Sequence, residues 1–197
     1  MSGDPSDLRV RRAVHADADA IGDAHAAAWE TAYTHIFEPE FLAAAVEGRR
    51  VGWRNSISRI LTPPNVLLVG EADGNVRAFA HAAPEPRRTR AAEIRAFYAH
   101  PGVWGSGLTA LLMGDLCEVL LEQGYEEVVL WTARDAHRAR GFYEKVGFCL
   151  TRNTRHDRMT DWTGTRDADI AEVEYGKRLQ HMPGSSPGGS ISGSGRG

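Results

Sequence analysis

Apolar and polar positions in the first third of the chain follow two different periods. Residues 8–14 alternate between apolar and basic side chains, which predicts a short strand. From Asp17, a candidate helix cap, to about Tyr33, apolar side chains recur every three to four residues and so share one helix face. Shorter helices are predicted over 39–46, which begins with proline, and over 49–61. One strand followed by three helices is therefore expected.

The middle of the chain has the pattern of a β-hairpin. Two apolar runs, 66–72 and 76–83, flank Asp73-Gly74, a dipeptide typical of two-residue hairpin turns. A polar loop over 84–90 separates this hairpin from a third run, 93–99, which also predicts a strand. Three consecutive strands are therefore expected in this part of the chain.

In the second half, helices and strands alternate. The predicted elements are a helix over 108–123, a strand over 128–132, a helix over 136–146, and two final strands over 148–155 and 171–179. Gly124 and Gly147 end the two helices, at positions where a left-handed backbone is usual. Because strands and helices interleave at both ends around a hairpin, we predict the α/β (α+β) class, with a mixed sheet and helices on its faces.

Composition indicates how many domains to expect. A chain of 197 residues with 42% hydrophobic side chains is long enough for one well-buried core and short for two. We therefore expect a single domain over 8–180. Residues 1–7 are polar, and residues 181–197 are dominated by Gly, Ser and Pro with little to bury. Both ends are predicted to be disordered.

Charge and residue usage exclude several classes of protein. The net charge of −3 gives no electrostatic basis for binding nucleic acid. No apolar run approaches the roughly 20 residues that span a bilayer, so no membrane partner is expected. The two cysteines, Cys117 and Cys149, lack CxxC spacing, and the eight histidines form no ligand pair. We therefore expect a reducing, cytoplasmic location and no metal.

A glycine-rich turn, Gly105-Ser106-Gly107, stands between a predicted strand and a predicted helix. Glycines there let the main chain approach a ligand, and the first N–H groups of the helix favour a phosphate or pyrophosphate. A tight turn without any ligand explains the same residues equally well. A dinucleotide site is disfavoured, because residues 101–104 separate the glycines from the strand and Glu127, the candidate ribose-binding acid, precedes the next strand. The pattern of a P-loop does not occur.

Two blocks of sequence together resemble the GNAT N-acetyltransferase superfamily. Residues 92–101 followed by 104–112 are similar to the family's acetyl-CoA strand, loop and helix, and residues 138–148 resemble its second signature at the correct distance downstream. The order of strands and helices over about residues 8–179 fits as well. The resemblance implies the GNAT fold, with a central mixed, mostly antiparallel sheet of about six to seven strands flanked by helices. It also implies acetyl-CoA as the acyl donor, direct transfer to an amine in a ternary complex, and no metal.

The resemblance places acetyl-CoA on the central strand, the glycine turn and the helix that follows. The residues it implies are Phe97, Tyr98, Ala99, Trp104, Gly105, Ser106, Gly107, Leu108, Thr109, Ala110 and Ala136. Main-chain N–H groups of the first three are expected to face the thioester oxygen. Two positions depart from the family pattern, since Thr109 adds a side chain beside the expected phosphates and Ala136 replaces a frequent Asn. These departures favour the alternative function, a catalytically weak or inactive module that binds acyl-CoA as a sensor or partner protein.

Two residues are candidates for proton transfer. An alkylamine has a pKa of about 10.4 and must lose a proton before it attacks. Glu93, whose place resembles that of the glutamate base in some family members, is the candidate base, and a surface carboxylate is the alternative interpretation. Tyr143 is the candidate acid for the CoA thiolate, and a packing tyrosine is the alternative. Packing in this helix is expected at Ala139, Phe142 and Val146.

The acceptor site is expected between the first helices and the loop 84–90. Trp29, Tyr33 and Trp131 are the candidate contacts, although aromatic side chains at helical spacing also pack cores. The partner expected is a small-molecule amine or a protein amine such as an amino terminus, and the resemblance is compatible with a homodimer. The sequence therefore predicts the donor and leaves the acceptor open.

Overall fold

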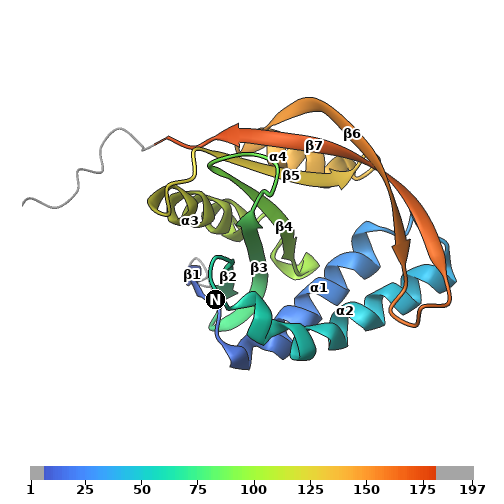
Figure 1. Ribbon diagram of the computed structural model, residues 1–197. Helices are drawn as coiled ribbons and strands as arrows, with labels where there is room; N and C mark the ends of the chain where they lie inside the picture. The colour runs from blue at the N-terminus through green and yellow to red at the C-terminus, as the bar shows by residue number, and fades with distance from the viewer. Residues whose placement is uncertain (1–6, 181–197) are drawn as a thin grey trace, which may run out of the picture.

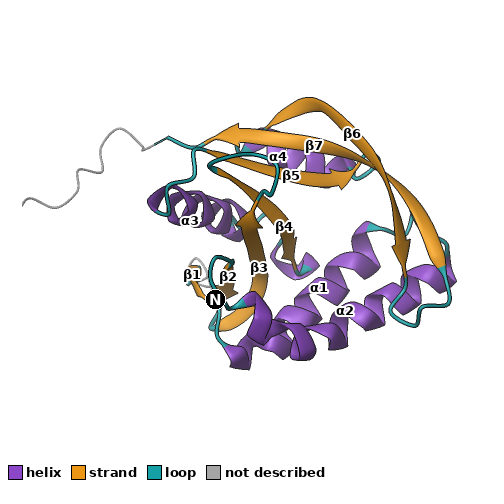
Figure 2. Ribbon diagram, in the orientation of Figure 1, coloured by secondary structure: helices purple, strands orange, loops and turns teal. Residues whose placement is uncertain are grey.

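The computed structural model describes residues 7–180, which form a seven-stranded sheet with helices on both faces (Figure 1, Figure 2). The elements are β1 (Arg9–Arg12), a 3₁₀ turn (His15–Asp17), α1 (Ala18–Ala32), α2 (Pro39–Ile60), β2 (Val66–Ala72), β3 (Asn75–Pro84), β4 (Ala91–Ala99), a second 3₁₀ turn (Pro101–Val103), α3 (Leu108–Glu122), β5 (Glu127–Ala133), α4 (His137–Lys145), β6 (Cys149–Thr160) and β7 (Asp167–Arg178). The ends predicted to be disordered lie outside the described residues, apart from Asp7. Within residues 7–180, no helix has the length and apolar character needed to cross a membrane.

The strands lie in the order β1-β2-β3-β4-β5-β7-β6. Every neighbouring pair is antiparallel except β4 and β5, which run parallel. The mixed, mostly antiparallel sheet that the sequence predicts is therefore confirmed. β4 and β5 pair only where Ala91–Ile94 face Glu127–Leu130. The sheet is consequently open at the carboxyl ends of its two central strands.

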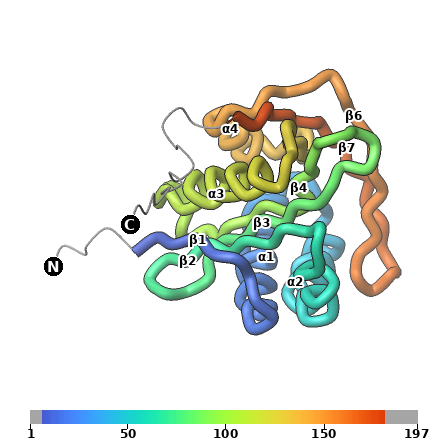
Figure 3. The backbone as a smooth tube through the Cα atoms, turned by 60° about the vertical axis from the view of Figure 1, so that its left-hand side comes forward, coloured from blue at the N-terminus to red at the C-terminus, as the bar shows by residue number. Residues whose placement is uncertain are grey.

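Helices cover both faces of the sheet, α1 and α2 on one face and α3 and α4 on the other (Figure 3). On the α3 face, buried leucines of α3 pack with the central strands, and Tyr143 of α4 and Tyr175 of β7 belong to the same cluster. On the opposite face, Trp53 and Ile57 of α2 pack with Phe79 of β3. Burial on two sides explains why the central strands have nearly continuous apolar sequences.

The turns predicted from glycine positions are confirmed. Asp73 and Gly74 have φ angles of 52° and 73°, as a type I′ hairpin turn requires, and they join Ala72 to its partner Asn75. The glycines at the ends of α3 and α4 have φ angles of 88° and 89°. The need for a left-handed backbone at these residues therefore determines where the hairpin turns and where the two helices end.

The two short helices predicted over 39–46 and 49–61 are one continuous helix, α2. Gly48, where the apolar pattern is interrupted, lies inside this helix. A Cβ atom added at Gly48 would lie 2.5 Å from the Cβ atom of Trp162, in the turn between β6 and β7. The glycine therefore permits close packing of that turn on the helix and does not end it, which the sequence pattern alone cannot distinguish.

The last two strands are longer than predicted. β6 continues to Thr160 and β7 begins at Asp167, whereas the sequence predicted an end at 155 and a start at 171. Most side chains of β6 are exposed, so this segment lacks the apolar alternation by which strands are recognised. The two strands form a ribbon, visible in Figure 1, whose tip reaches α2.

Asp17 does not cap α1 with its side chain as predicted. Its carboxylate accepts hydrogen bonds from the Arg11 guanidinium at 2.7 and 2.9 Å and from the N–H of Val14 at 2.8 Å. The aspartate thus joins β1 to the turn that precedes the helix.

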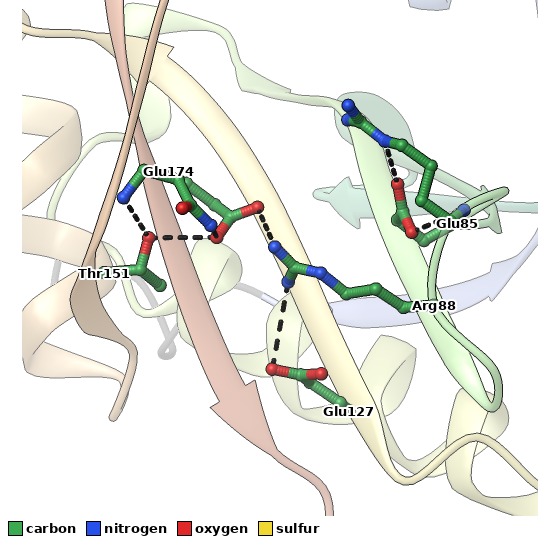
Figure 4. A network of polar contacts seen from close by, with 7 residues as sticks. Glu85, Arg88, Glu127, Thr151 and Glu174 are labelled. Atoms are coloured by element: carbon green, nitrogen blue, oxygen red, sulfur yellow. Dashed lines mark hydrogen bonds and ion pairs between the residues drawn. The ribbon is translucent and has the colours of Figure 1, made fainter.

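A buried ion pair fixes the loop between β3 and β4 (Figure 4). Arg88 donates to Glu174 at 2.6 Å and lies 3.9 Å from Glu127. Glu174, buried on β7, also accepts hydrogen bonds from Thr151 at 2.9 Å and Asn153 at 2.7 Å. The loop is thereby held at the amino-terminal end of β4, remote from the open ends of the central strands.

Candidate active site

The opening between β4 and β5 leads into a cavity of about 870 Å³. Its wall on one face comes from β4, the glycine turn, α3 and α4, and its wall on the other face comes from α1, α2, β5 and the β6–β7 ribbon. All but two of the predicted site residues line this cavity, the exceptions being Ser106 and Leu108. Leu108 is fully buried in the core, and the Ser106 hydroxyl donates to the carbonyl of Val103 at 2.8 Å.

The main chain of β4 presents free N–H groups to this opening. The N–H of His100 donates to the carbonyl of Arg77 at 2.8 Å. In an antiparallel pair only every second residue forms hydrogen bonds with the neighbouring strand, so the next residue of β4 bonded to β3 is Tyr98. The N–H groups of Phe97 and Ala99 therefore point toward the side where β5 has diverged. Ile94 pairs with Ala82 and Ala96 with His81, so Arg95 is left without a partner on β3. This bulge bends β4 just before Phe97.

The glycine turn places the start of α3 at the same opening. Gly105 and Gly107 have φ angles of 85° and 96°, which only glycine adopts without strain, and both line the cavity. The first hydrogen bond of the helix runs from Leu111 to the carbonyl of Gly107, so the N–H groups of Thr109 and Ala110 have no partner within the helix. This end of the cavity therefore offers main-chain donors and the positive end of a helix dipole.

A positive side chain lies beside the glycine turn. The Trp104 indole donates to the carbonyl of Ala99 at 2.9 Å, and the Arg138 guanidinium lies 4.1 Å from the centre of its ring. Lys145, at the end of α4, also lines the cavity. An anion with several phosphates is the kind of ligand that this arrangement favours.

Tyr143 lies between the cavity and the core. It is the one buried side chain of α4, in edge contact with Phe97 (centroids 6.5 Å apart) and close to Phe148 and Tyr175 (both 6.0 Å). The packed stripe predicted for this helix is instead only partly buried, since Phe142 lines the cavity. Burial, with a smaller effect from Tyr98, raises the pKa of Tyr143 well above its ordinary value. The hydroxyl is therefore protonated at neutral pH.

Glu93 lies on the opposite face of β4. Its neighbours Ala92 and Ile94 belong to the core cluster under α3, so the alternation of the strand turns Glu93 toward the other wall of the cavity. Trp131 of β5 lies on this same wall. The Glu93 carboxylate is half-buried and makes no ion pair with any of residues 7–180.

The β6–β7 ribbon, and not the loop 84–90, completes the second wall. Arg155 lies 4.5 Å from the Trp131 ring centre and pairs with Glu172 at 2.5 Å. Trp29 and Tyr33 close this end of the cavity, with their rings stacked 4.4 Å apart. The predicted aromatic residues are therefore brought together, whereas the expected loop does not reach the cavity.

One residue that the sequence analysis missed is Arg49 of α2. It lines the cavity and its guanidinium carbon lies 3.1 Å from the centre of the Trp29 ring. Burial, followed by the effect of Arg49, holds the pKa of the adjacent His25 well below its ordinary value, so His25 is neutral. In the sequence, Arg49 lies four residues after Ala45 and four before Trp53, and both of these residues are buried in the structure. This helical spacing was the available signal that Arg49 lies on the inward face of the helix.

Comparison with known proteins relates the chain to acyltransferases. The sequence model described as the acetyltransferase (GNAT) family matches residues 19–148, which contain both sequence blocks and most of the cavity wall. A probable N-acetyltransferase of Mycobacterium tuberculosis is 23% identical over 181 residues, covering 91% of this chain and 99% of that protein.

Solved structures share the fold at lower identity. The PaiA N-acetyltransferase of Thermoplasma acidophilum, solved in complex with coenzyme A, matches with a TM-score of 0.69 and 18% identity over 87% of this chain and 98% of its own. The ribosomal-protein-S18-alanine N-acetyltransferase of Escherichia coli matches with a TM-score of 0.63 and 14% identity, over 91% and 99% respectively.

Proposed function

The chain belongs to the acetyltransferase (GNAT) family and is an acyltransferase, and from this premise we propose that it transfers the acetyl group of acetyl-CoA to a primary amine. Both substrates bind the same cavity, the donor from the α3 side and the acceptor from the side of α1 and the β6–β7 ribbon. The amine, carried by a small molecule or a protein, attacks the donor directly.

The glycine turn binds the pyrophosphate of acetyl-CoA in this proposal. Gly105, Gly107, Thr109 and Ala110 line the cavity end where α3 begins, and there the free N–H groups of the first helical turn and the helix dipole attract an anion. Arg138 supplies positive charge for phosphate oxygens. The Thr109 side chain, which lines the cavity, donates a further hydrogen bond from its hydroxyl.

Transfer begins with removal of a proton from the ammonium form of the acceptor. Glu93 takes this proton, directly or through water, and the neutral amine attacks the thioester carbonyl carbon. The carbonyl oxygen gains negative charge as the C–N bond forms, and the N–H groups of Phe97 and Ala99 stabilise it. A second proton leaves the nitrogen for solvent as the amide forms.

The C–S bond then breaks and CoA leaves as a thiolate. Tyr143 donates its hydroxyl proton to the sulfur and regains one from solvent, so the products are the acetylated amine and CoA thiol. Its raised pKa keeps the hydroxyl protonated until this step. A thiol has a pKa of about 8.5 and leaves tolerably well as an anion, so Tyr143 assists the reaction without being essential.

The observation that carries the proposal is the joint position of three groups on one cavity. Phe97 at the open edge of β4 and Glu93 on the other face of the same strand line this cavity together with Tyr143, which comes from α4 some fifty residues later. An acyl transfer needs a donor for the oxyanion, an acid for the leaving group and a base for the nucleophile. The arrangement supports all three roles.

Calorimetry and a thiol-release assay test the proposal. Acetyl-CoA should bind and NADPH should not, and thiol release with a panel of primary amines should depend on the amine and decrease in Glu93→Gln. Binding of acetyl-CoA without thiol release by any amine would favour the alternative, an acyl-CoA-binding module. Thr109 and Ala136 support that alternative, because both depart from the family pattern at the donor site.

A further inference from the structure

Arg49 is a cation at the acceptor end of the cavity, in a helix face that is otherwise apolar. Phe41, Ala45 and Trp53, which precede and follow it at four-residue intervals on α2, are all buried. Arg49 lines the cavity, with its guanidinium packed on the Trp29 ring. A charge in this position is costly unless something binds it.

No carboxylate of residues 7–180 pairs with Arg49. Its one hydrogen bond runs from Nη1 to the carbonyl of Ala45, one turn earlier on the same helix, at 3.0 Å. Two other arginines differ in this respect, since Arg155 in the same cavity pairs with Glu172 and the adjacent Arg50 pairs with Asp23 at 2.8 Å. Arg95 and Arg138 also line the cavity without an ion pair to the described residues, but both are exposed, so Arg49 differs from them in being enclosed.

Two enclosed donors beside each other also lack acceptors. Nε of Arg49 and Nε1 of Trp29 are buried and have no hydrogen-bond partner within the described part of the chain. Buried donors without partners are rare in folded proteins, and these two show that the protein itself satisfies the guanidinium poorly. Burial, opposed by the neighbouring Tyr98 and Tyr33, lowers the pKa of Arg49 to about 10, so the side chain is still charged at neutral pH. Arg49 is therefore a charged side chain at the cavity wall with few hydrogen bonds of its own, which favours a ligand that carries a negative charge and accepts hydrogen bonds.

We propose that Arg49 binds a carboxylate of the acceptor substrate, and that the acceptor is an amino acid or a similar small molecule with an amine and a carboxylate. This inference rests on the proposed function, because it concerns the same cavity. A guanidinium matches a carboxylate in shape and can donate two parallel hydrogen bonds to it.

The charges of the cavity fit such a zwitterion. Glu93 faces the acceptor side without an ion pair, so it can receive the ammonium end, while Arg49 receives the anionic end. A polyamine would instead bring a second positive charge toward Arg49, and the face of Trp29 that could attract a cation is already covered by Arg49. An acceptor without a negative group would leave the Arg49 charge uncompensated.

The test compares each amino acid with its own carboxamide, which lacks the negative charge and is otherwise nearly identical. The full chain, alone and saturated with CoA, is titrated by calorimetry with the standard L-amino acids and with their amides. At least one acid should bind about tenfold or more tightly than its amide, as expected for a charged hydrogen-bonded pair. Thiol release from acetyl-CoA should show the same preference in kcat/KM.

Variants of Arg49 and of its neighbour Arg50 show which side chain is responsible for the preference for the acid over its amide. Arg49→Gln should reduce the acid-to-amide ratio to near one and change binding of the amide less than about threefold. Arg49→Lys should restore part of the preference, because it returns the charge without the planar group. Arg50→Gln is the matched control, since Arg50 is exposed on the same helix, pairs with Asp23 and lies outside the cavity wall. It should keep the wild-type ratio.

Equal binding of every acid and its amide by the wild type would overturn the inference, as would a preference that survives in Arg49→Gln. If Arg49→Gln does not fold, the wild-type ratio decides by itself. Efficient acetylation of amines or peptides that lack a nearby carboxylate, in preference to the acids, would also contradict it. Failure of the proposed function would have a different signature: no binding of acetyl-CoA, or no thiol release, irrespective of which acids bind.

Discussion

The guanidinium of Arg88, in the loop between β3 and β4, donates to the carboxylate of Glu174 on β7 at a distance of 2.6 Å. The contact crosses β5, so it ties together the two halves of the sheet that diverge at the cavity (Figure 4). Glu174 is almost completely buried, whereas Arg88 is partly exposed. Burial favours the neutral form of Glu174, but hydrogen bonds from Arg88, Asn153 and Thr151 outweigh it and hold its pKa below the ordinary value.

Arg88→Gln should lower the free energy of unfolding by about 2–3 kcal/mol at pH 7, because it leaves a buried carboxylate without its cation. In the wild type the lowered pKa of Glu174 stabilises the fold above its unfolded pKa of about 4.3, and this contribution is lost as pH falls through the folded pKa. In the variant only the hydrogen bonds from Asn153 and Thr151 still oppose burial, so the pKa of Glu174 should be higher than in the wild type and its stabilising contribution at pH 7 should be smaller. Urea unfolding should therefore give a smaller difference in the free energy of unfolding between the wild type and Arg88→Gln at pH 4 than at pH 7.

Arg90→Gln provides the control for this ion pair. Arg90 lies in the same loop and pairs with Glu126 at 2.6 Å, but both side chains are more than half exposed. Its loss should cost less than about 1 kcal/mol at either pH. An equal cost for both variants would show that burial of Glu174 does not govern the stability of this loop.

Tyr143→Phe should lower kcat by about tenfold to a hundredfold, since a positioned general acid contributes about that much or more. Stability should change little, because the ring contacts with Phe97, Phe148 and Tyr175 are kept and the hydroxyl bonds to none of residues 7–180. Thiol release under saturating substrates measures the effect. Tyr125→Phe, a half-buried tyrosine beyond the end of α3 and outside the cavity wall, is the control. An unchanged kcat in folded Tyr143→Phe would remove the residue from the mechanism.

Glu93→Gln should reduce kcat/KM most strongly near neutral pH, where the acceptor amine is protonated. The rate of the variant should recover as pH rises toward the amine pKa of about 10.4, because solvent then supplies the neutral amine. A pH profile of thiol release from pH 6 to 10 tests this, with Glu118→Gln, an exposed position on α3, as control. Parallel profiles for Glu93→Gln and the wild type would assign Glu93 a role other than base.

Gly48→Ala should destabilise the fold by about 1–3 kcal/mol, although alanine is the better helix former, because its Cβ atom would collide with Trp162. Gly52→Ala, one turn later on α2, meets open space and should instead stabilise by about 0.5–1 kcal/mol. Thermal unfolding compares the two. Because the nearest atom is the Cβ of Trp162, Gly48→Ala should cost much less in a Trp162→Gly background, and an undiminished cost there would place its origin elsewhere.

Prediction from sequence succeeded where local chemistry dictates the backbone. The hairpin at Asp73-Gly74 and the helix ends at Gly124 and Gly147 require positive φ angles, so their positions could be inferred residue by residue. Gly48 shows the limit of this approach, because its importance depends on a partner, Trp162, that lies more than a hundred residues away in the chain. A glycine that permits close packing and one that ends a helix look the same in a sequence.

The amino-acid sequence by itself determined the family, the mixed sheet and the residues of the proposed donor end of the cavity, since the glycine turn and the block around Tyr143 are local patterns with local geometric consequences. Only the tertiary structure decided which residues form the proposed acceptor end. The β6–β7 ribbon is too polar to be recognised from the sequence as a wall of the cavity. The charge of Arg49 becomes informative only when the structure shows that its Nε is enclosed and that no carboxylate of residues 7–180 pairs with it. Long-range packing, which no local pattern encodes, brings these side chains to the opening between β4 and β5.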